Sequence, residues 1–353
     1  MSLGVVVMDA DRTHVSRLKS WLQNIRHVRL AHASKAKVAL RMLSAWDWNL
    51  LVVDPHSADG REVLIQAKRL NPWLAVFVVT GNRSSEFIEQ TVQCRIDDLM
   101  FKPLARTAFL ERAVQLAAEA RGRQQREQRR VLAIGAHPDD VELGCAGTLA
   151  KHIAEGDVVK ILTMSRGAAG GDSRVRMREA RRAAKVLGAT VEFGNLPDAH
   201  ISEGFQTIAL IERFIRKMQP THVYTHAPED THQDHRAVHA ATLVAAREVP
   251  NVYCYQAPSS TVDFHPTHFV DINGFVEFKL RAIEAHESQA TNNAPFMESF
   301  VKGAAYYWGR FAGHGLVEPM RVVRQREGLR APLGERGALA PSSLSEREVD
   351  DHE

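Results

Sequence analysis

Short apolar runs rich in β-branched residues alternate along this chain with stretches whose apolar residues recur at helical spacing. In the first series, helical patterns such as 14–25 and 36–43 separate five expected strands: Leu3–Met8, Val28–Ala31, Leu50–Val53, Ala75–Val79 and Ile96–Met100. Strands that alternate with helices predict βα units and a parallel sheet. The alternation therefore places this part of the chain in the α/β class.

A second series follows a charged segment, with expected strands Val131–Gly135, Val158–Thr163, Thr190–Phe193, His222–Thr225, Asn251–Tyr255 and His268–Ile272. We predict two doubly wound domains, a flavodoxin-like one over residues 1–118 and a Rossmann-like one over 131–325. A helix is expected over residues 104–128, and its charged end, 119–130, is expected to be an arginine-rich linker helix between the domains. The tail, 326–353, is rich in Gly, Pro, Ser and charge and is expected to be disordered.

Composition excludes several classes of protein. Lys and Arg number 45 against 42 Asp and Glu, a net charge of +3 that gives no general case for nucleic-acid binding. The arginine-rich segment keeps a nucleic-acid contact as the alternative to a solvated linker. Three scattered cysteines are too few for a disulfide framework or a thiolate zinc cage. Without an apolar run of about 18 residues or a secretory signal, we expect a cytoplasmic protein with no membrane span.

Histidines are combined with aspartates in two segments that directly follow expected strands. His137-Pro138-Asp139-Asp140 comes after Val131–Gly135, and His232-Gln233-Asp234-His235 comes after His222–Thr225. Burying a carboxylate or an imidazole costs desolvation free energy unless the group is paired, and binding a divalent cation offsets that cost. One His and one Asp from the first segment with one His from the second would supply the three protein ligands of a catalytic zinc. Surface histidines beside a helix-capping Asp pair are the alternative.

The two segments resemble the motifs of the PIG-L/LmbE-like deacetylases, zinc enzymes that act on N-acetylglucosamine-type substrates. The resemblance covers about residues 131–324, with the opening motif at 137–148. It implies that His137, Asp140 and His235 bind one Zn²⁺ and that Asp139 is the general base. It also implies that His232, oriented by Asp234, polarises the substrate carbonyl or stabilises the oxyanion.

Weaker matches to the same family concern the substrate. Arg176, three residues before Glu179, resembles an arginine that contacts the sugar, with a surface ion pair as the alternative. Asp198 follows a proline and resembles a loop aspartate near the sugar hydroxyls, with a turn residue as the alternative. The resemblance thus assigns Arg176 and Asp198 to substrate binding. His286-Glu287-Ser288-Gln289 resembles a late motif that borders the site.

Residues 3–116 resemble response-regulator receiver domains. The resemblance implies a phosphoacceptor at Asp54, in a pocket formed by Asp9, Asp11, Thr80 and Lys102. Receivers have two consecutive acidic residues after the first strand, whereas Ala10 separates Asp9 from Asp11 here. A missing carboxylate weakens Mg²⁺ binding, so Mg²⁺ in this pocket is in doubt. A phosphorylation switch and a degenerate receiver kept for dimerisation or docking are the two alternatives.

These observations predict a zinc-dependent de-N-acetylase of an N-acetylated amino sugar or its conjugate, regulated by the receiver-like domain. The alternatives are an amidase on a non-sugar N-acyl conjugate and a signalling protein whose hydrolase domain is an output or docking module. The expected partners are the amino-sugar substrate, a histidine kinase or another signalling protein, and a second copy in a homodimer. Nucleic acid is not an expected partner.

Overall fold

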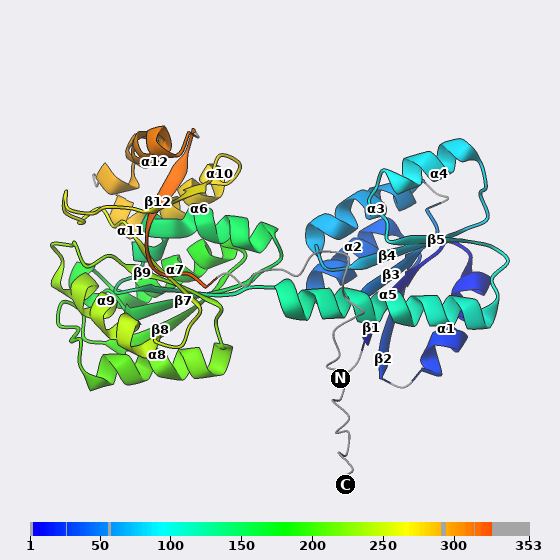
Figure 1. The fold of residues 1–353 in the computed structure, drawn as a ribbon, viewed down its shortest axis with the longest axis horizontal. Coiled ribbons are helices and arrows are strands. Elements are labelled where there is room, and N and C mark those ends of the chain that lie inside the picture. Colours follow the sequence, from blue (N-terminus) through cyan, green and yellow to red (C-terminus); the bar gives the residue numbers. More distant parts are fainter. Residues whose placement is uncertain (1–2, 26, 56–57, 291–293, 314, 327–353) are drawn as a thin grey trace, which may run out of the picture.

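The computed structural model describes residues 3–25, 27–55, 58–290, 294–313 and 315–326 (Figure 1). The first sheet contains β1 (Leu3–Met8), β2 (Val28–Ala33), β3 (Leu50–Val53), β4 (Ala75–Thr80) and β5 (Asp98–Phe101). Its order is β2-β1-β3-β4-β5 and every pairing is parallel. This is the flavodoxin-like order, so the predicted fold class is confirmed.

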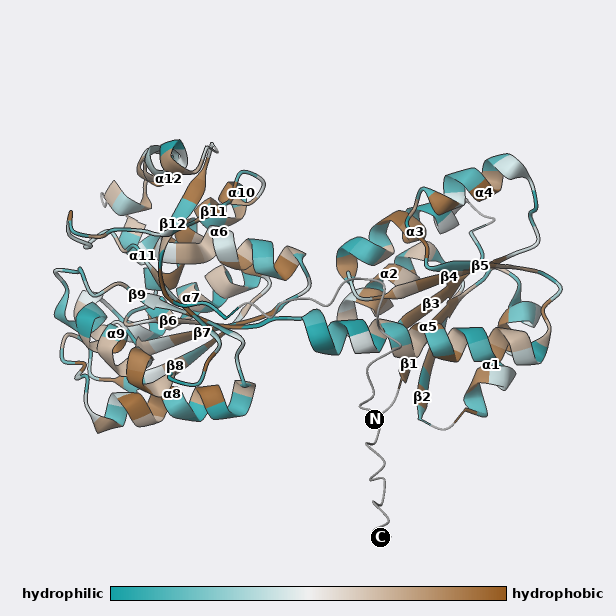
Figure 2. Cartoon of the chain, in the orientation of Figure 1, coloured by the Kyte–Doolittle hydropathy of each residue, from teal (hydrophilic) through white to brown (hydrophobic). Residues whose placement is uncertain are grey.

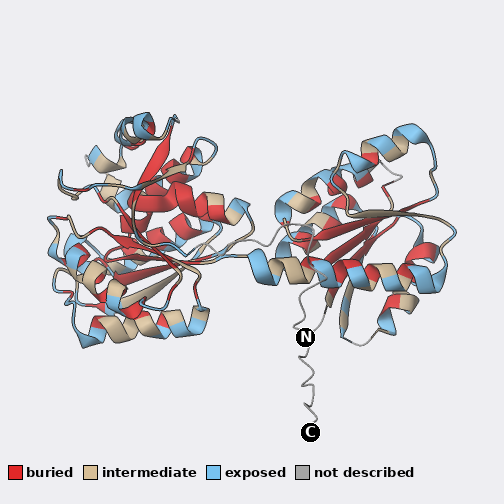
Figure 3. Cartoon of the chain, in the orientation of Figure 1, coloured by how far each residue is buried: buried red, intermediate tan, exposed pale blue. Residues whose placement is uncertain are grey.

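Helices cover both faces of the first sheet because its central strands, β1, β3 and β4, are apolar on both sides. Val5 and Val7 of β1 pack with α1 (Arg12–Gln23) and α5 (Arg106–Glu127). Val6 and Met8 point to the other face and pack with α2 (Ala36–Ala45) and α3 (Ala58–Leu70). The remaining helix of this part, α4 (Ser85–Val92), lies between β4 and β5 in the chain. Figure 2 shows the apolar strands and Figure 3 their burial.

The second sheet is mixed and has the order β11-β12-β10-β9-β6-β7-β8. Its strands are β6 (Arg130–Gly135), β7 (Val158–Ser165), β8 (Thr190–Leu196), β9 (His222–His226), β10 (Asn251–Tyr255), β11 (His268–Asp271) and β12 (Val317–Arg324). The first five of these are parallel, and β12 runs antiparallel to β10 and β11. We did not expect β12, since Pro319 and its charged residues weaken the strand pattern.

Two helical layers enclose the second sheet. On one face lie α6 (Asp140–Ala154), α7 (Ser173–Leu187) and α10 (Val276–Glu284), and on the other lie α8 (Phe205–Met218) and α9 (Gln233–Ala245). The short α11 (Glu287–Ala290) and the longer α12 (Glu298–Ala312) follow α10, and α12 packs beside β12. Single 3₁₀ turns occur at Ala168–Gly170 and Ala294–Phe296.

The arginine-rich segment forms the end of α5, as predicted. Residues up to Glu127 continue α5, whose buried side packs on the first sheet, and Arg130 already belongs to β6. Arg123 pairs with Asp97 at 3.4 Å and Arg129 with Glu155 at 2.8 Å. These ion pairs favour a structural role for the arginines over a nucleic-acid contact. The exact domain boundaries remain a proposal.

Two further sequence predictions concern the chain ends and membranes. Residues 327–353 of the expected tail lie outside the described residues. Among the described residues, no helix combines the length and the apolar character that a membrane crossing requires.

Candidate metal centre and active site

The two histidine–aspartate segments lie at the same edge of the second sheet. β6 and β9 are parallel neighbours, so the loops that leave their carboxyl ends meet there. Asp139 adopts a left-handed backbone conformation with φ of 108° at the start of α6. Such a conformation costs a non-glycine residue roughly 1–3 kcal/mol and is concentrated at functional sites. The turn aims both Asp139 and Asp140 into the space between the loops.

The Asp140 carboxylate is surrounded by imidazole rings. Its oxygens lie 3.3 Å from His235 Nε2, 3.2 Å from His226 Nε2 and 3.4 Å from His137 Nδ1. Burial opposes ionisation of Asp140, but the positive charge of His235 and its neighbours holds the pKa of Asp140 well below its usual range. In turn, burial opposes the charge on His137, yet the Asp140 carboxylate raises the pKa of His137 to about 10.

The donor atoms fit a zinc ion. Two overlapping groups, one of Asp140, His226 and His235 and one of His137, His232 and His235, each bring three donor atoms within 4.8 Å of one another. Imidazole nitrogen with carboxylate oxygen is the donor set that zinc takes in catalytic sites. These groups contain all three predicted ligands, His137, Asp140 and His235.

His226 also lies in this cluster, but its ring is engaged by the backbone. Its Nε2 accepts the Ala136 backbone N–H at 3.0 Å, so the lone pair is already used. Burial and the positive charge of His235 lower the pKa of His226 to about 4, which keeps the ring neutral. We did not predict His226 from the sequence, where it is only the last residue of a strand.

The carboxylate of Asp230 orients the His235 ring through its second nitrogen, and we did not predict this residue from the sequence. His235 Nδ1 lies 2.9 Å from Asp230 Oδ2 and 3.2 Å from Ser259 Oγ. Although burial works against it, the hydrogen bond from His235 lowers the pKa of Asp230. A carboxylate on the second ring nitrogen is the usual way in which a protein orients a metal-binding histidine. No motif in the sequence marks Asp230.

Asp139 is held by Arg176. The guanidinium donates from Nη2 to Asp139 Oδ2 at 2.9 Å and to the Pro138 carbonyl at 2.7 Å, and from Nη1 to the Gly167 carbonyl at 3.1 Å. Burial and the charge of Asp140 raise the pKa of Asp139, while Arg176 opposes that shift. The guanidinium thus contacts the expected general base and also lines the cavity, and the predicted contact of Arg176 with substrate stays a prediction.

His232 caps the start of α9, and its Nδ1 accepts the Asp234 backbone N–H at 3.2 Å. Because Nδ1 accepts, a neutral His232 carries its proton on Nε2. Burial and the charges of His235 and His137 lower the pKa of His232, which favours the neutral form. We expected the Asp234 carboxylate to orient His232, but it lies 3.1 Å from His137 Nε2 instead.

Asp198 also reaches His137. Its Oδ1 lies 3.0 Å from His137 Nε2, and its Oδ2 accepts the Ala169 N–H at 2.7 Å. Asp198 therefore connects the glycine-rich loop after β7 to the metal centre. It lines a cavity of about 280 Å³ with other residues of the site: His137, Asp139, Asp140, Arg176, His232, His235, Ser259 and Phe296. All the predicted site residues of this domain except Asp234 line this one cavity.

In the receiver pocket, a lysine ammonium lies between two carboxylates, in contrast to the imidazole rings of the metal centre. Lys102 Nζ lies 2.9 Å from Asp9 Oδ2 and 2.8 Å from Asp54 Oδ2, and His14 Nδ1 lies 2.6 Å from Asp9. Thr80 is fully buried at the end of β4. The prediction for Asp11 needs correction, because its exposed carboxylate accepts the N–H groups of Thr13 and His14 and caps α1. Free N–H groups at a helix start attract such a carboxylate.

Comparisons with known proteins identify both parts of the chain. Residues 132–246 match the family model for GlcNAc-PI de-N-acetylase (PIG-L), and residues 5–114 match that for the response regulator receiver domain. Over 169 residues, 45% of this chain and 90% of the relative, the chain is 37% identical to the uncharacterized deacetylase YaiS of Escherichia coli. It is 30% identical to diacetylchitobiose deacetylase of Thermococcus kodakarensis over 227 residues, 55% of this chain and 83% of the relative.

A solved structure agrees with this comparison. A conserved protein of Thermus thermophilus superposes with a TM-score of 0.51 and 26% identity over 58% of this chain and 100% of its own. Fold and site together define an α/β protein with a histidine–aspartate centre at the carboxyl ends of its strands. The chain belongs to the PIG-L family, and its N-terminal part is a response regulator receiver domain.

Proposed function

We propose that this protein is a zinc-dependent de-N-acetylase that hydrolyses the acetamide of an N-acetylglucosamine-type sugar or conjugate. One observation carries the proposal: His137, Asp140 and His235 converge beside the buried Asp139 in a single cavity. The family membership supports it, since a relative that is 30% identical is a diacetylchitobiose deacetylase. The receiver domain would act as the regulatory part.

His137, Asp140 and His235 would hold the cation, with their imidazole and carboxylate donors. A zinc ion held there would supply Lewis-acid chemistry, lowering the pKa of a water molecule and polarising the acyl carbonyl. Asp230 keeps the His235 ring oriented through the 2.9 Å contact to Nδ1. This arrangement leaves the opposite side of the cavity to the substrate.

Asp139 is the general base of the proposed reaction. It takes a proton from the attacking water and returns it to the leaving amine. A carboxylate whose pKa is raised by burial can do both near neutral pH, and Arg176 prevents it from turning away. His232 would donate its Nε2 proton to the oxygen on which negative charge develops, because Nδ1 is occupied by a backbone N–H.

The test is the release of amine from N-acetylglucosamine and N,N′-diacetylchitobiose by the full chain. Asp139→Asn should lower kcat by about 10²–10⁴-fold, with zinc content unchanged. The exposed Asp263 offers a matched control, and Asp263→Asn should be as active as the wild type. The proposal is wrong if Asp139→Asn retains full activity, or if the purified protein holds no metal. Amine released from non-sugar N-acyl compounds alone would favour the amidase alternative.

A further inference from the structure

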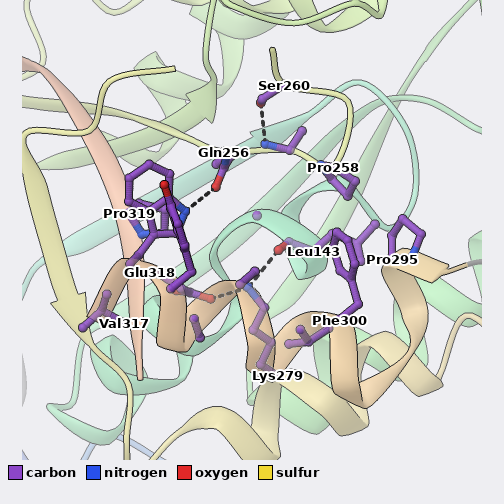
Figure 4. Close-up of a pocket in the computed structure, with 17 residues that line it drawn as sticks. Leu143, Gln256, Pro258, Ser260, Lys279, Pro295, Phe300, Val317, Glu318 and Pro319 are labelled. Atoms are coloured by element: carbon purple, nitrogen blue, oxygen red, sulfur yellow. Dashed lines mark hydrogen bonds and ion pairs between the residues drawn. The ribbon is translucent and has the colours of Figure 1, made fainter. Parts of the chain in front are cut away.

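A second cavity adjoins the candidate active site. It has a volume of about 260 Å³ and shares the wall residues Leu143, Pro258 and Pro295 with the first. Figure 4 shows these three side chains at one side of the cavity, with Phe300 beside them. The second cavity is therefore the neighbouring space for the part of a molecule that extends beyond the metal centre.

The far wall is apolar and comes from one helix. α12 contributes Phe300, Val301, Ala304, Ala305, Tyr307 and Trp308. Phe300 and Tyr307 are 44% and 51% exposed, so their rings are also accessible from outside. Ligand cavities in proteins are typically lined in this way, by apolar and aromatic side chains with a few polar groups.

The charged groups of the wall are already paired. Lys279 Nζ donates to Glu318 Oε1 at 2.6 Å and to the Leu143 carbonyl at 2.8 Å. The other carboxylate oxygen of Glu318 accepts the Thr148 N–H and hydroxyl. Among the described residues, the cavity thus presents no unpaired charge to a ligand, which favours a neutral occupant.

Several of the uncharged polar groups are engaged with one another as well. The Trp308 indole N–H donates to Gln256 Oε1 at 2.8 Å, and the Ala257 N–H donates to Ser260 Oγ at 3.0 Å (Figure 4). A second sugar ring would bring several hydroxyl groups that need hydrogen-bond partners when buried. An apolar group has no such requirement. The volume is sufficient, because a benzene ring already fits in a protein cavity of about 150 Å³.

We propose that this second cavity binds an apolar, uncharged aglycone of the substrate. The inference rests on the proposed deacetylase function and narrows its substrate class to amino sugars that carry a hydrophobic group. Deacetylation breaks only the bond between the acetyl carbon and nitrogen, so the aglycone stays attached and needs its own space. It is bonded to the sugar carbon next to the one that bears the acetamide, within reach of the adjoining cavity.

The test compares the phenyl and methyl glycosides of N-acetylglucosamine, as both anomers, with the full-length enzyme. We expect kcat/KM for the phenyl glycoside to exceed that for the methyl glycoside by about tenfold or more, through KM. Ala304→Phe should fill the cavity and remove this preference. Gly303→Phe adds the same side chain at an exposed position of α12 outside the cavity and should keep the preference.

Each result has a distinct meaning. Equal kcat/KM for the phenyl and methyl glycosides in the wild type overturns the inference, whether or not Ala304→Phe folds. So does N,N′-diacetylchitobiose hydrolysed faster than the phenyl glycoside, because a second sugar then occupies the cavity. Hydrolysis of the methyl glycoside with no phenyl preference leaves the deacetylase function intact. If no glycoside releases amine, the proposed function fails, and the aglycone inference fails with it.

Discussion

The receiver pocket and the candidate metal centre occupy the same place in two doubly wound sheets, yet they differ in their readiness to bind a cation. In the receiver pocket, the ammonium of Lys102 lies between Asp9 and Asp54. In the metal centre, imidazole rings surround Asp140. A protonated lysine only competes with a cation, whereas an imidazole can release its proton and become a ligand.

The pKa shifts in the receiver pocket reflect this difference. Burial opposes the charge on Lys102, but its hydrogen bonds to Asp54 and Asp9 raise the pKa of Lys102. Hydrogen bonds from His14 and Lys102 outweigh burial and lower the pKa of Asp9 to about 2. In the receiver pocket, a fixed positive charge is thus already paired with both carboxylates. A location at the carboxyl ends of strands is therefore not sufficient for a metal site. The side chains there must also be able to release their protons and act as ligands.

The largest effect should come from removing a ligand of the metal centre. We expect His235→Ala to weaken zinc binding by at least about 100-fold, while Asp54→Asn in the receiver pocket leaves it unchanged. Competition with a zinc chelator measures both. His265→Ala removes an exposed histidine and serves as the control. Zinc lost on Asp54→Asn would contradict the distinction between the two regions.

A smaller loss of zinc affinity is expected when a residue that orients a ligand is changed. Asp230→Asn removes the carboxylate on His235 Nδ1 and should weaken zinc binding by about 10–100-fold. The variant should still load fully when zinc is in excess, since all three ligands remain. The same chelator titration gives the answer, and an unchanged affinity would show that Asp230 has no orienting role.

A substitution in the receiver pocket should make this region more similar to a metal site. Ala10→Asp restores two consecutive acidic residues after β1 and should strengthen Mg²⁺ binding by about tenfold. Calorimetry with Mg²⁺, on protein whose metal centre is already loaded with zinc, would measure it. If Ala10→Asp does not strengthen Mg²⁺ binding, the charge of Lys102 is sufficient to oppose the cation, and Ala10→Asp combined with Lys102→Gln should then bind Mg²⁺ more tightly.

The smallest effect concerns pH and stability. Because the pKa of Asp9 is lowered from 3.8 to about 2, its ionised form stabilises the fold above pH 3.8, and this contribution is lost as the pH falls towards 2. The free energy of unfolding should therefore differ between the wild type and Asp9→Asn by on the order of 1 kcal/mol more at pH 6 than at pH 2.5. Urea unfolding followed by tryptophan fluorescence tests this, since four of the five tryptophans precede residue 80. A difference that is independent of pH would contradict it.

Much of the fold follows from local pattern. The strands Leu3–Met8, Leu50–Val53 and Asn251–Tyr255 have the predicted bounds, because continuous apolar runs between turn residues leave few alternatives. The strand Val317–Arg324 was missed, because its stability depends on pairing with β10 and β11 and not on its own composition. The helix over 106–127 was predicted with nearly these bounds, and only the structure shows the partners of its charged end, such as Asp97 for Arg123.

In the site, sequence by itself determined which residue types stand at the strand ends: His137, Asp139 and Asp140 after β6, and His232 to His235 after β9. Only the tertiary structure decided their partners. It placed Arg176 on Asp139 across 37 positions of the chain, Asp234 on His137 across 97, and Asp230 behind His235. The physical reason is that pairing between charged groups depends on distance and burial, which arise only when separate loops meet at one edge of the sheet.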